Sequence, residues 1–240
     1  MPDPHAKTDR HVLVGVFAKH WTPGRTKTRL AAKLGDEQAA LASRHFLRAT
    51  LQRIQRVAAA RVLAFSPSDK EADFAELAES LDAAWTLMPQ PEGSLGDRMK
   101  WFFDQCAALG ARSAVLLGSD SPDFPIEAVR SAIDWLESPD KDQGVVFGPA
   151  EDGGYWLIGA RGPTPPVLSD MPWSEANLLA RSIERLVSLG WRRGAEYELT
   201  TEWCDIDSAD DLERLKLRLT KSALDDQTLA SLAEELSGLG

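Results

Sequence analysis

The chain has 240 residues, of which 43% are hydrophobic and 27% are charged, a composition that excludes a disordered or fibrous protein. Its 37 acidic and 27 basic residues give a formal net charge of −10, and a field of that sign repels nucleic-acid phosphates. No apolar run approaches the roughly 18–20 residues that a membrane span needs, and Met1–Lys7 lacks the apolar core of a signal peptide. We therefore expect a cytoplasmic protein with neither a nucleic-acid partner nor a membrane partner.

Short apolar runs alternate with amphipathic stretches along the chain. The short, β-branched runs predict buried strands at 12–17, 61–65, 114–118 and 144–148. Helical spacing of apolar residues predicts helices at 35–57, 69–81, 95–109 and 126–136. Beyond residue 148 the pattern predicts a strand at 154–160 and helices at 177–189, 209–219 and 224–236. The alternation predicts a three-layer α/β/α fold in which a mainly parallel mixed sheet has helices on both faces.

Nothing in the sequence marks a repeat, a low-complexity tract or a linker. We therefore expect a single domain over residues 1–240, with its core at 12–219 and a C-terminal helix at 224–236. The two cysteines, Cys106 and Cys204, lie far apart without a CxxC motif, which excludes a disulfide framework and a cysteine zinc site. An unpaired edge strand or an exposed tryptophan-rich patch would favour a homodimer.

A basic loop follows the first predicted strand. Lys19, Arg25, Lys27 and Arg29 lie within eleven residues of an otherwise acidic chain. Ligands of open α/β sheets bind beyond the carboxyl ends of the strands, and such cations suit a diphosphate or triphosphate. The loop matches neither a Walker A motif nor GxGxxG. A solvated basic loop is the alternative interpretation, but its position after a buried strand favours phosphate binding.

Carboxylates follow the strand that ends at Gly118. Asp120 and Asp123 are placed where Mg²⁺ or Mn²⁺ could be bound together with substrate phosphates. Asp123 precedes Pro125 and a predicted helix, so an N-cap and a metal ligand are equally good interpretations of it. Asp120 is less needed as a cap, and we interpret it as a metal ligand.

A glycine-rich turn separates the strands at 144–148 and 154–160. Glu151, Asp152, Gly153, Gly154 and Tyr155 follow one another there. An Asp-Gly-Gly sequence is typical of a hairpin turn. The adjacent carboxylates and the aromatic residue are not required by a turn, and glycines allow close approach to a ligand. We leave the turn and the binding site as alternatives.

A second group of acidic residues precedes the helix predicted at 209–219. Ser208 with Asp211 resembles a capping box that carries Asp in place of the usual Glu or Gln. That pattern leaves Asp205 and Asp207 unexplained, and a second metal ligand is the obvious interpretation for them.

These segments, taken in order, resemble the glycosyltransferase-A-like bacterial transferases named radical-SAM/selenodomain-associated transferases, some of which are linked to arsenosugar biosynthesis. The resemblance runs from about Val12 to Leu215. It rests on Lys19 with Pro23-Gly24, Lys27–Leu30, Gly93–Met99, Gly118–Pro122, Gly148–Tyr155, Pro172–Ser174 and Asp205–Asp207. Two departures are His20-Trp21, where the family usually has Ala-Pro, and Glu175, where it usually has Thr.

The resemblance implies a nucleotide-diphospho-sugar transferase fold and roles for the motif residues. On the nucleotide side it implies Lys19, Gly24, Lys27, Arg29, Gly96 and Arg98. It implies Asp120 and Asp207 as ligands of Mg²⁺ or Mn²⁺. Asp152 is implied as a catalytic base or a ligand of the acceptor, with Glu151 as the alternative base. Gly153, Gly154, Tyr155 and Trp173 are the residues expected on the acceptor side.

The function that we predict is metal-dependent transfer of a sugar from a nucleotide-sugar to a small-molecule acceptor. The first alternative is a nucleotidyltransferase that joins an NTP to a phosphorylated small molecule and releases pyrophosphate. The second is a nucleotide-binding protein without catalysis. The nucleotidyltransferase loop rich in glycine and arginine is missing here, and the full set of candidate carboxylates argues against a non-catalytic protein.

Overall fold

The computed structural model describes residues 12–57, 60–81, 83–162, 164–169, 171, 173, 175–222 and 225–239. Its strands are β1 (Val12–Lys19), β2 (Ala60–Ser66), β3 (Thr86–Pro89), β4 (Ser113–Gly118), β5 (Gly144–Pro149), β6 (Tyr155–Arg161) and β7 (Tyr197–Leu199). Its helices are α1 (Thr28–Leu34), α2 (Asp36–Ile54), the 3₁₀ turn η1 (Ser68–Lys70), α3 (Glu71–Glu79), α4 (Leu95–Ala108), α5 (Ile126–Leu136), α6 (Leu178–Ser188), α7 (Ala209–Ser222) and α8 (Gln227–Ser237).

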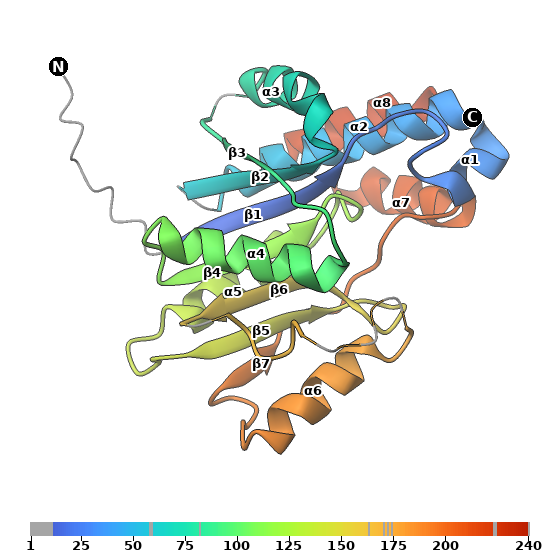
Figure 1. Ribbon diagram of the computed structural model, residues 1–240. Helices are drawn as coiled ribbons and strands as arrows, with labels where there is room; N and C mark the ends of the chain where they lie inside the picture. The colour runs from blue at the N-terminus through green and yellow to red at the C-terminus, as the bar shows by residue number, and fades with distance from the viewer. Residues whose placement is uncertain are drawn as a thin grey trace, which may run out of the picture.

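The strands of this part of the chain form one mixed sheet in the order β3-β2-β1-β4-β6-β5-β7 (Figure 1). Pairing is parallel between β1 and β2, β2 and β3, β1 and β4, and β5 and β7. It is antiparallel where β6 lies between β4 and β5. The prediction of a mainly parallel mixed sheet is confirmed.

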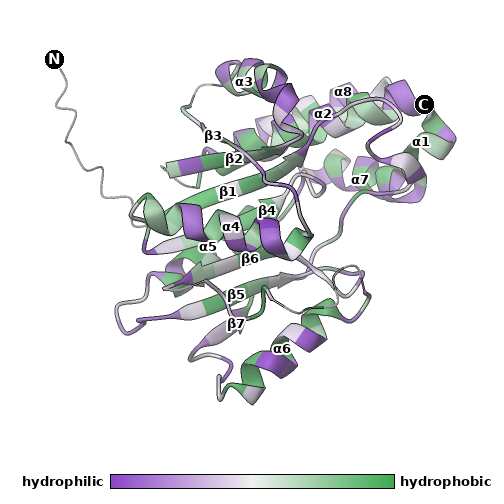
Figure 2. Cartoon of the chain, in the orientation of Figure 1, coloured by the Kyte–Doolittle hydropathy of each residue, from purple (hydrophilic) through white to green (hydrophobic). Residues whose placement is uncertain are grey.

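Helices cover both faces of the sheet, as its strands require. Alternate residues of β1 separate the two sides: Val14 and Val16 belong to one apolar cluster, and Leu13 to the other. Helices α2, α3 and α5 pack on the first face, and α4 and α6 on the second. The central strands are hydrophobic along their length (Figure 2), which is the pattern of strands buried on both faces. The three-layer prediction is confirmed.

A third apolar cluster extends the first helical layer. The outer face of α2, represented by Phe46, packs with Leu30 of α1 and with the leucines of α7 and α8. The C-terminal pair of helices therefore lies against α2 rather than against the sheet (Figure 1). No helix in the described residues is both long enough and apolar enough to cross a membrane.

Four elements differ from the sequence prediction. Strand β3 at the sheet edge has only four residues and no fully buried side chain, and β7 has three residues, so neither contains a long enough alternating run to be recognised. Helix α1 lies inside the stretch predicted as a polar loop. Its one buried residue is Leu30, so the sequence shows no apolar periodicity from which the helix could be predicted. The helix predicted at 69–81 begins as the 3₁₀ turn η1.

Candidate active site

A cavity of about 1630 Å³ lies at the edge of the sheet where β1 and β4 end. Because these two strands are parallel neighbours, their carboxyl ends, Lys19 and Gly118, meet at the same edge. Strand β6 runs antiparallel to β4, so its first residues reach this edge too. The cavity is therefore formed by loops from both halves of the sheet. This is the position at which open α/β sheets bind ligands.

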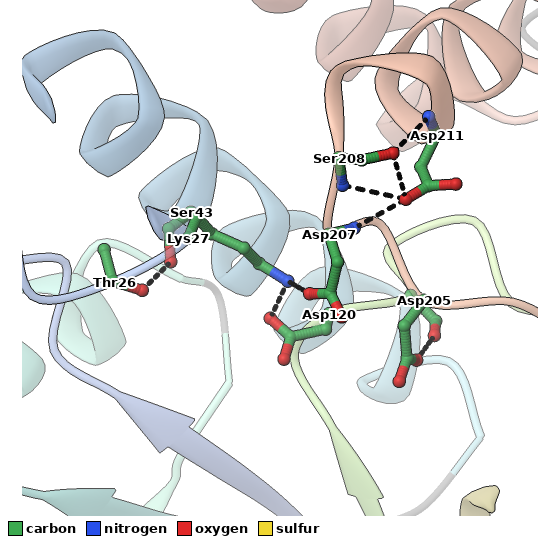
Figure 3. Close-up of polar contacts among 9 residues, drawn as sticks. Thr26, Lys27, Ser43, Asp120, Asp205, Asp207, Ser208 and Asp211 are labelled. Atoms are coloured by element: carbon green, nitrogen blue, oxygen red, sulfur yellow. Dashed lines mark hydrogen bonds and ion pairs between the residues drawn. The ribbon is translucent and has the colours of Figure 1, made fainter. Parts of the chain in front are cut away.

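Lys27 lies between two carboxylates in this cavity. Its Nζ is 2.7 Å from Asp120 Oδ1 and 2.8 Å from Asp207 Oδ1 (Figure 3). The lysine side chain is 4% exposed, whereas those of Asp120 and Asp207 are 47% and 52% exposed. Burial alone would lower the pKa of the ammonium, but the two carboxylates outweigh burial and raise its pKa. The Lys27 ammonium therefore stays protonated and links the two carboxylates.

The backbone at Lys27 is unusual. Its φ of +47° places a non-glycine residue in the left-handed region, immediately before α1. Such a conformation costs a non-glycine residue about 1–2 kcal/mol. In this conformation the side chain turns into the cavity and contacts both carboxylates.

Backbone contacts join the segments that carry the two aspartates. The amide of Ile206 donates to the carbonyl oxygen of Asp120 at 2.9 Å. Nearby, Ser121 Oγ donates to Asp205 Oδ1 at 2.5 Å. Burial raises the pKa of the Asp205 carboxyl to about 6, although the hydrogen bond from Ser121 opposes the shift.

The start of α7 fixes the orientation of Asp207. The carboxylate of Asp211 accepts hydrogen bonds from the amides of Asp207 (3.2 Å) and Ser208 (2.8 Å), and the Asp211 amide donates to Ser208 Oγ (3.2 Å). The capping box predicted for Ser208 and Asp211 is confirmed. The same Asp211 carboxylate (Figure 3) therefore stabilises the helix and holds the backbone of a candidate ligand.

Asp123 has neither of the two roles that its position suggested. Pro125 is the N-cap of α5, without a side-chain cap. The Asp123 side chain is 3% exposed, and both of its oxygens accept hydrogen bonds from Arg218 of α7 at 2.6 and 3.2 Å. Trp203 Nε1 lies 3.3 Å from Oδ1. The alternatives of N-cap and metal ligand are corrected to a buried ion pair that secures the loop after β4.

Cationic side chains form part of the cavity lining. The lysine and arginine residues that line it are Lys19, Arg25, Lys27, Arg29, Lys70 and Arg98. Among the described residues, the buried Nε of Arg98 has no hydrogen-bond partner, and a bound anion would provide one. Gly24 does not line the cavity; its φ is +73°, and an added Cβ would lie 3.2 Å from Asp36 Oδ2.

Gly96 and Trp173 contact each other beside the cavity rather than lining it. A Cβ on Gly96 would lie 2.6 Å from three atoms of the Trp173 indole ring. The group that approaches Gly96 closely is therefore the Trp173 side chain of the same chain. Pro172 and Ser174, the neighbours of Trp173 in its motif, lie outside the described residues.

Some residues of the loop between β5 and β6 line the cavity, and others do not. Asp152, Gly154 and Tyr155 line the cavity, whereas the exposed Glu151 does not. Asp152 Oδ1 accepts a hydrogen bond from the Gly154 amide at 2.9 Å, which fixes its orientation. The structure thus favours Asp152 over Glu151 as the group that could act on a bound ligand.

Gly153 allows this loop to pack tightly against the segment before α6. Its φ is +86°, and an added Cβ would lie 1.7 Å from the carbonyl oxygen of Ala176. The Gly153 carbonyl in turn accepts a hydrogen bond from the Leu179 amide at 2.9 Å. Any side chain at residue 153 must therefore separate the two segments.

We expect Gly153→Ala to destabilise the protein by at least about 2 kcal/mol, from a left-handed alanine together with the displaced Ala176 carbonyl. Gly190→Ala is the matched control, because its φ is +82° and an added Cβ meets nothing within 4 Å. That control should lose only about 1 kcal/mol. Urea denaturation measures both values, and equal losses would contradict the close contact.

Several cavity residues were not identified from the sequence. Ser66–Lys70 and Gln90–Glu92 follow β2 and β3 and line the cavity. The first group follows a predicted strand, so the strand-end rule that identified Lys19 could have found it. The second group follows β3, which was not predicted. Asp205, which the sequence did single out as a possible second metal ligand, lines the cavity as well.

The donor set fits a divalent cation that binds together with a substrate. In the described residues, no group of three or more His, Cys, Asp or Glu side chains is arranged to hold a metal ion. Asp120 and Asp207 offer two half-exposed carboxylates beside the cationic loop. Mg²⁺ is commonly held by one or two carboxylates and completes its shell with substrate phosphates and water. A site of two carboxylates matches that requirement and does not match a permanent all-protein metal centre.

Two comparisons place this geometry among known proteins. The profile of the family described as "Uncharacterized protein conserved in bacteria (DUF2064)" matches residues 50–175. A crystal structure from Desulfovibrio desulfuricans G20, provisionally described as a nucleotide-diphospho-sugar transferase, is 31% identical with a TM-score of 0.80 and covers 95% of this chain and 96% of that one. No curated protein matches the chain.

More distant structures share the fold alone. A cytidylyltransferase from Leptospira borgpetersenii is 15% identical, with a TM-score of 0.53 and coverage of 95% of this chain and 94% of that chain. The 4-diphosphocytidyl-2C-methyl-D-erythritol synthase of Anaerococcus prevotii is 11% identical, with a TM-score of 0.54 and coverage of 87% and 98%.

Proposed function

The chain belongs to the bacterial family DUF2064, and on that premise we propose that it is a nucleotide-utilising transferase that moves a sugar from a nucleoside-diphospho-sugar to a small acceptor. The observation that carries the proposal is the bridge of Lys27 between Asp120 and Asp207 inside a cavity lined by further cations. That arrangement can hold a diphosphate on one side and a divalent cation on the other. The similarity to the Desulfovibrio protein supports it.

The nucleotide diphosphate would bind at the cationic part of the cavity lining. Lys19 is the last residue of β1, Arg29 lies in the first turn of α1, and Arg98 of α4 lines the same cavity. Guanidinium groups can bind phosphate oxygens in pairs, and ammonium groups contribute point charge. These side chains would stabilise the negative charge that grows on the leaving diphosphate.

Asp120 and Asp207 would hold Mg²⁺ or Mn²⁺ through their exposed oxygens. A divalent cation in that position supplies electrostatic stabilisation to the departing diphosphate. Lys27 keeps the two carboxylates close together in the absence of the ion, because their mutual repulsion is offset by its buried charge. The two candidate ligands are therefore already in place before a ligand arrives.

Asp152 is the proposed general base. The acceptor hydroxyl oxygen forms a bond to the anomeric carbon of the sugar while the bond from that carbon to the diphosphate oxygen breaks. The electron pair of the broken bond leaves with the nucleoside diphosphate, and the hydroxyl proton passes to the Asp152 carboxylate. Asp152 lines the cavity and is oriented by the Gly154 amide.

The test is binding of a nucleotide panel followed by thermal denaturation. NTPs, NDPs and NDP-sugars are each added with Mn²⁺, Mg²⁺ or EDTA. At a ligand concentration of 100 times Kd we expect about 2.7 kcal/mol of stabilisation, which corresponds to about 5–10 °C for a chain of this size. The largest shift should come from one NDP-sugar in the presence of metal and should disappear in EDTA.

Other outcomes of this panel separate the alternatives. A shift selective for one NTP, with pyrophosphate as product, would replace glycosyl transfer by nucleotidyl transfer, the reaction class named for the more distant cytidylyltransferases. Absence of a shift with every nucleotide would contradict both reactions.

A further inference from the structure

The cations that line the cavity are confined to the first part of the chain. All six lysine and arginine side chains of the lining come from residues 19–98, where two carboxylates, Asp69 and Glu92, also line the cavity. From Met99 onward, the charged residues of the lining are carboxylates only: Asp120, Asp152, Glu175, Asp205 and Asp207. We refer to the lining residues of 17–29, 66–70 and 90–98 as the cationic half, and to those of 116–120, 150–158, 175–178 and 205–207 as the carboxylate half.

The sheet order places the strands that lead into the two halves on opposite sides of one boundary, whereas α4, which carries Arg98, contacts Trp173 through Gly96. Strands β3, β2 and β1 are adjacent and lead into the cationic half, whereas β4, β6 and β5 are adjacent and lead into the carboxylate half. The boundary lies between β1 and β4. Lys27 belongs to the cationic half, but its Nζ lies at this boundary and contacts Asp120 and Asp207 of the carboxylate half (Figure 3).

The carboxylate half also offers apolar surface. Tyr155, Trp156, Leu157 and Ile158 at the start of β6 contribute to it, together with Leu178 of α6. Carboxylates next to aromatic and aliphatic side chains accept hydrogen bonds from hydroxyl groups while the carbon skeleton packs on the apolar surface. A phosphate group placed beside Asp152 and Glu175 would face like charges, and the lysine that contacts this half, Lys27, is already paired with Asp120 and Asp207.

We propose that the acceptor is an uncharged polyhydroxyl compound bound in the carboxylate half, and that phosphorylated acceptors are rejected there. This inference rests on the proposed function, because it assigns the cationic half to the nucleotide donor. It deepens that function by naming the acceptor class. It also argues against transfer to a phosphate-bearing acceptor, since such an acceptor needs cations of its own in addition to those that hold the donor phosphates.

The first experiment requires no turnover. Inorganic pyrophosphate is added to the full chain, and amide hydrogen exchange is compared with and without it. Protection is expected in 19–29 and 66–70 and not in 150–158 or 175–178. Protection of the carboxylate half by pyrophosphate would overturn the inference, whether or not any nucleotide is turned over.

The second experiment uses matched acceptors with the donor that the nucleotide panel identifies. Glycerol is compared with glycerol 3-phosphate, and inositol with inositol 1-phosphate, by following release of the nucleoside diphosphate. We expect kcat/KM to be at least about tenfold lower for each phosphate ester. Equal or faster turnover of the esters would overturn the inference while leaving the transferase proposal intact.

A charge reversal tests the cause of the selectivity. Glu175→Lys places a cation in the carboxylate half and should reduce the discrimination against the phosphate esters by about tenfold. Glu202→Lys is the matched control, because Glu202 is exposed and does not line the cavity. An unchanged ratio in Glu175→Lys, or an equal change in both variants, would contradict the electrostatic cause. Absence of turnover by the wild-type chain with every acceptor, together with the expected pyrophosphate protection, would instead mark failure of the transferase proposal.

Discussion

Asp120→Asn is expected to lower kcat by about 10²–10³-fold, the loss that follows removal of a group that stabilises developing charge. The substitution retains the shape of the side chain and an oxygen that can accept from Lys27, but removes the negative charge that a divalent cation requires. Its carboxylate is 47% exposed, so the fold should tolerate the change. Steady-state kinetics with the donor from the nucleotide panel measures the effect.

Two further measurements make this result specific. The stabilisation that nucleotide provides should no longer depend on Mn²⁺ in Asp120→Asn, because one of the two candidate ligands is lost. Asp134→Asn removes an exposed carboxylate from α5 and should retain the activity of the wild type. Full kcat in Asp120→Asn would show that the metal assignment is wrong.

Arg53→Met is expected to cost about 3 kcal/mol of stability, because it removes one partner of a buried ion pair. The Arg53 side chain is 5% exposed; it pairs with Asp226 and donates to the carbonyl oxygen of Phe124 at 2.6 Å. Methionine would leave that carbonyl unsatisfied and Asp226 poorly compensated. The loss should lower Tm by about 6–12 °C for a chain of this size.

Arg56→Met is the matched variant for Arg53→Met. Arg56 pairs with the same Asp226 at 2.9 Å, but its side chain is 41% exposed. Water can replace much of this interaction, so we expect a loss below about 1 kcal/mol. Equal losses in the two variants, measured by urea denaturation, would contradict the argument from burial.

Sequence patterns predicted the long elements well because their periodicity reports burial directly. The bounds predicted for α5 coincide with those in the structure, and its apolar residues form a continuous buried face. Strands β1, β2, β4, β5 and β6 were predicted within two residues at each end, because their runs are buried on both faces. The short elements β3 and β7 carry no comparable signal, since pairing to a neighbour rather than local pattern makes them strands.

For the site, the sequence identified single residues at strand ends but not their partners. Lys27, Asp120 and Asp207 were each singled out locally, and the structure brings them into contact. Asp123 could not be interpreted correctly, because Arg218 is 95 residues away in the chain. The contact between Gly96 and Trp173 was equally invisible, since only packing shows which ring occupies the space above a glycine.

The bridge at Lys27 also has a consequence for the order in which the protein acquires its site during synthesis. The two residues of the Lys27–Asp207 contact are 180 positions apart, and Arg53 and Asp226 are 173 apart. A nascent chain emerges from its N-terminus, so β1 and α2 leave the ribosome long before their charged partners have been translated. Lys27, which also contacts Asp120, cannot contact Asp207 until the segment before α7 has been translated. The Lys27–Asp207 contact can therefore form only when nearly the whole polypeptide has been made.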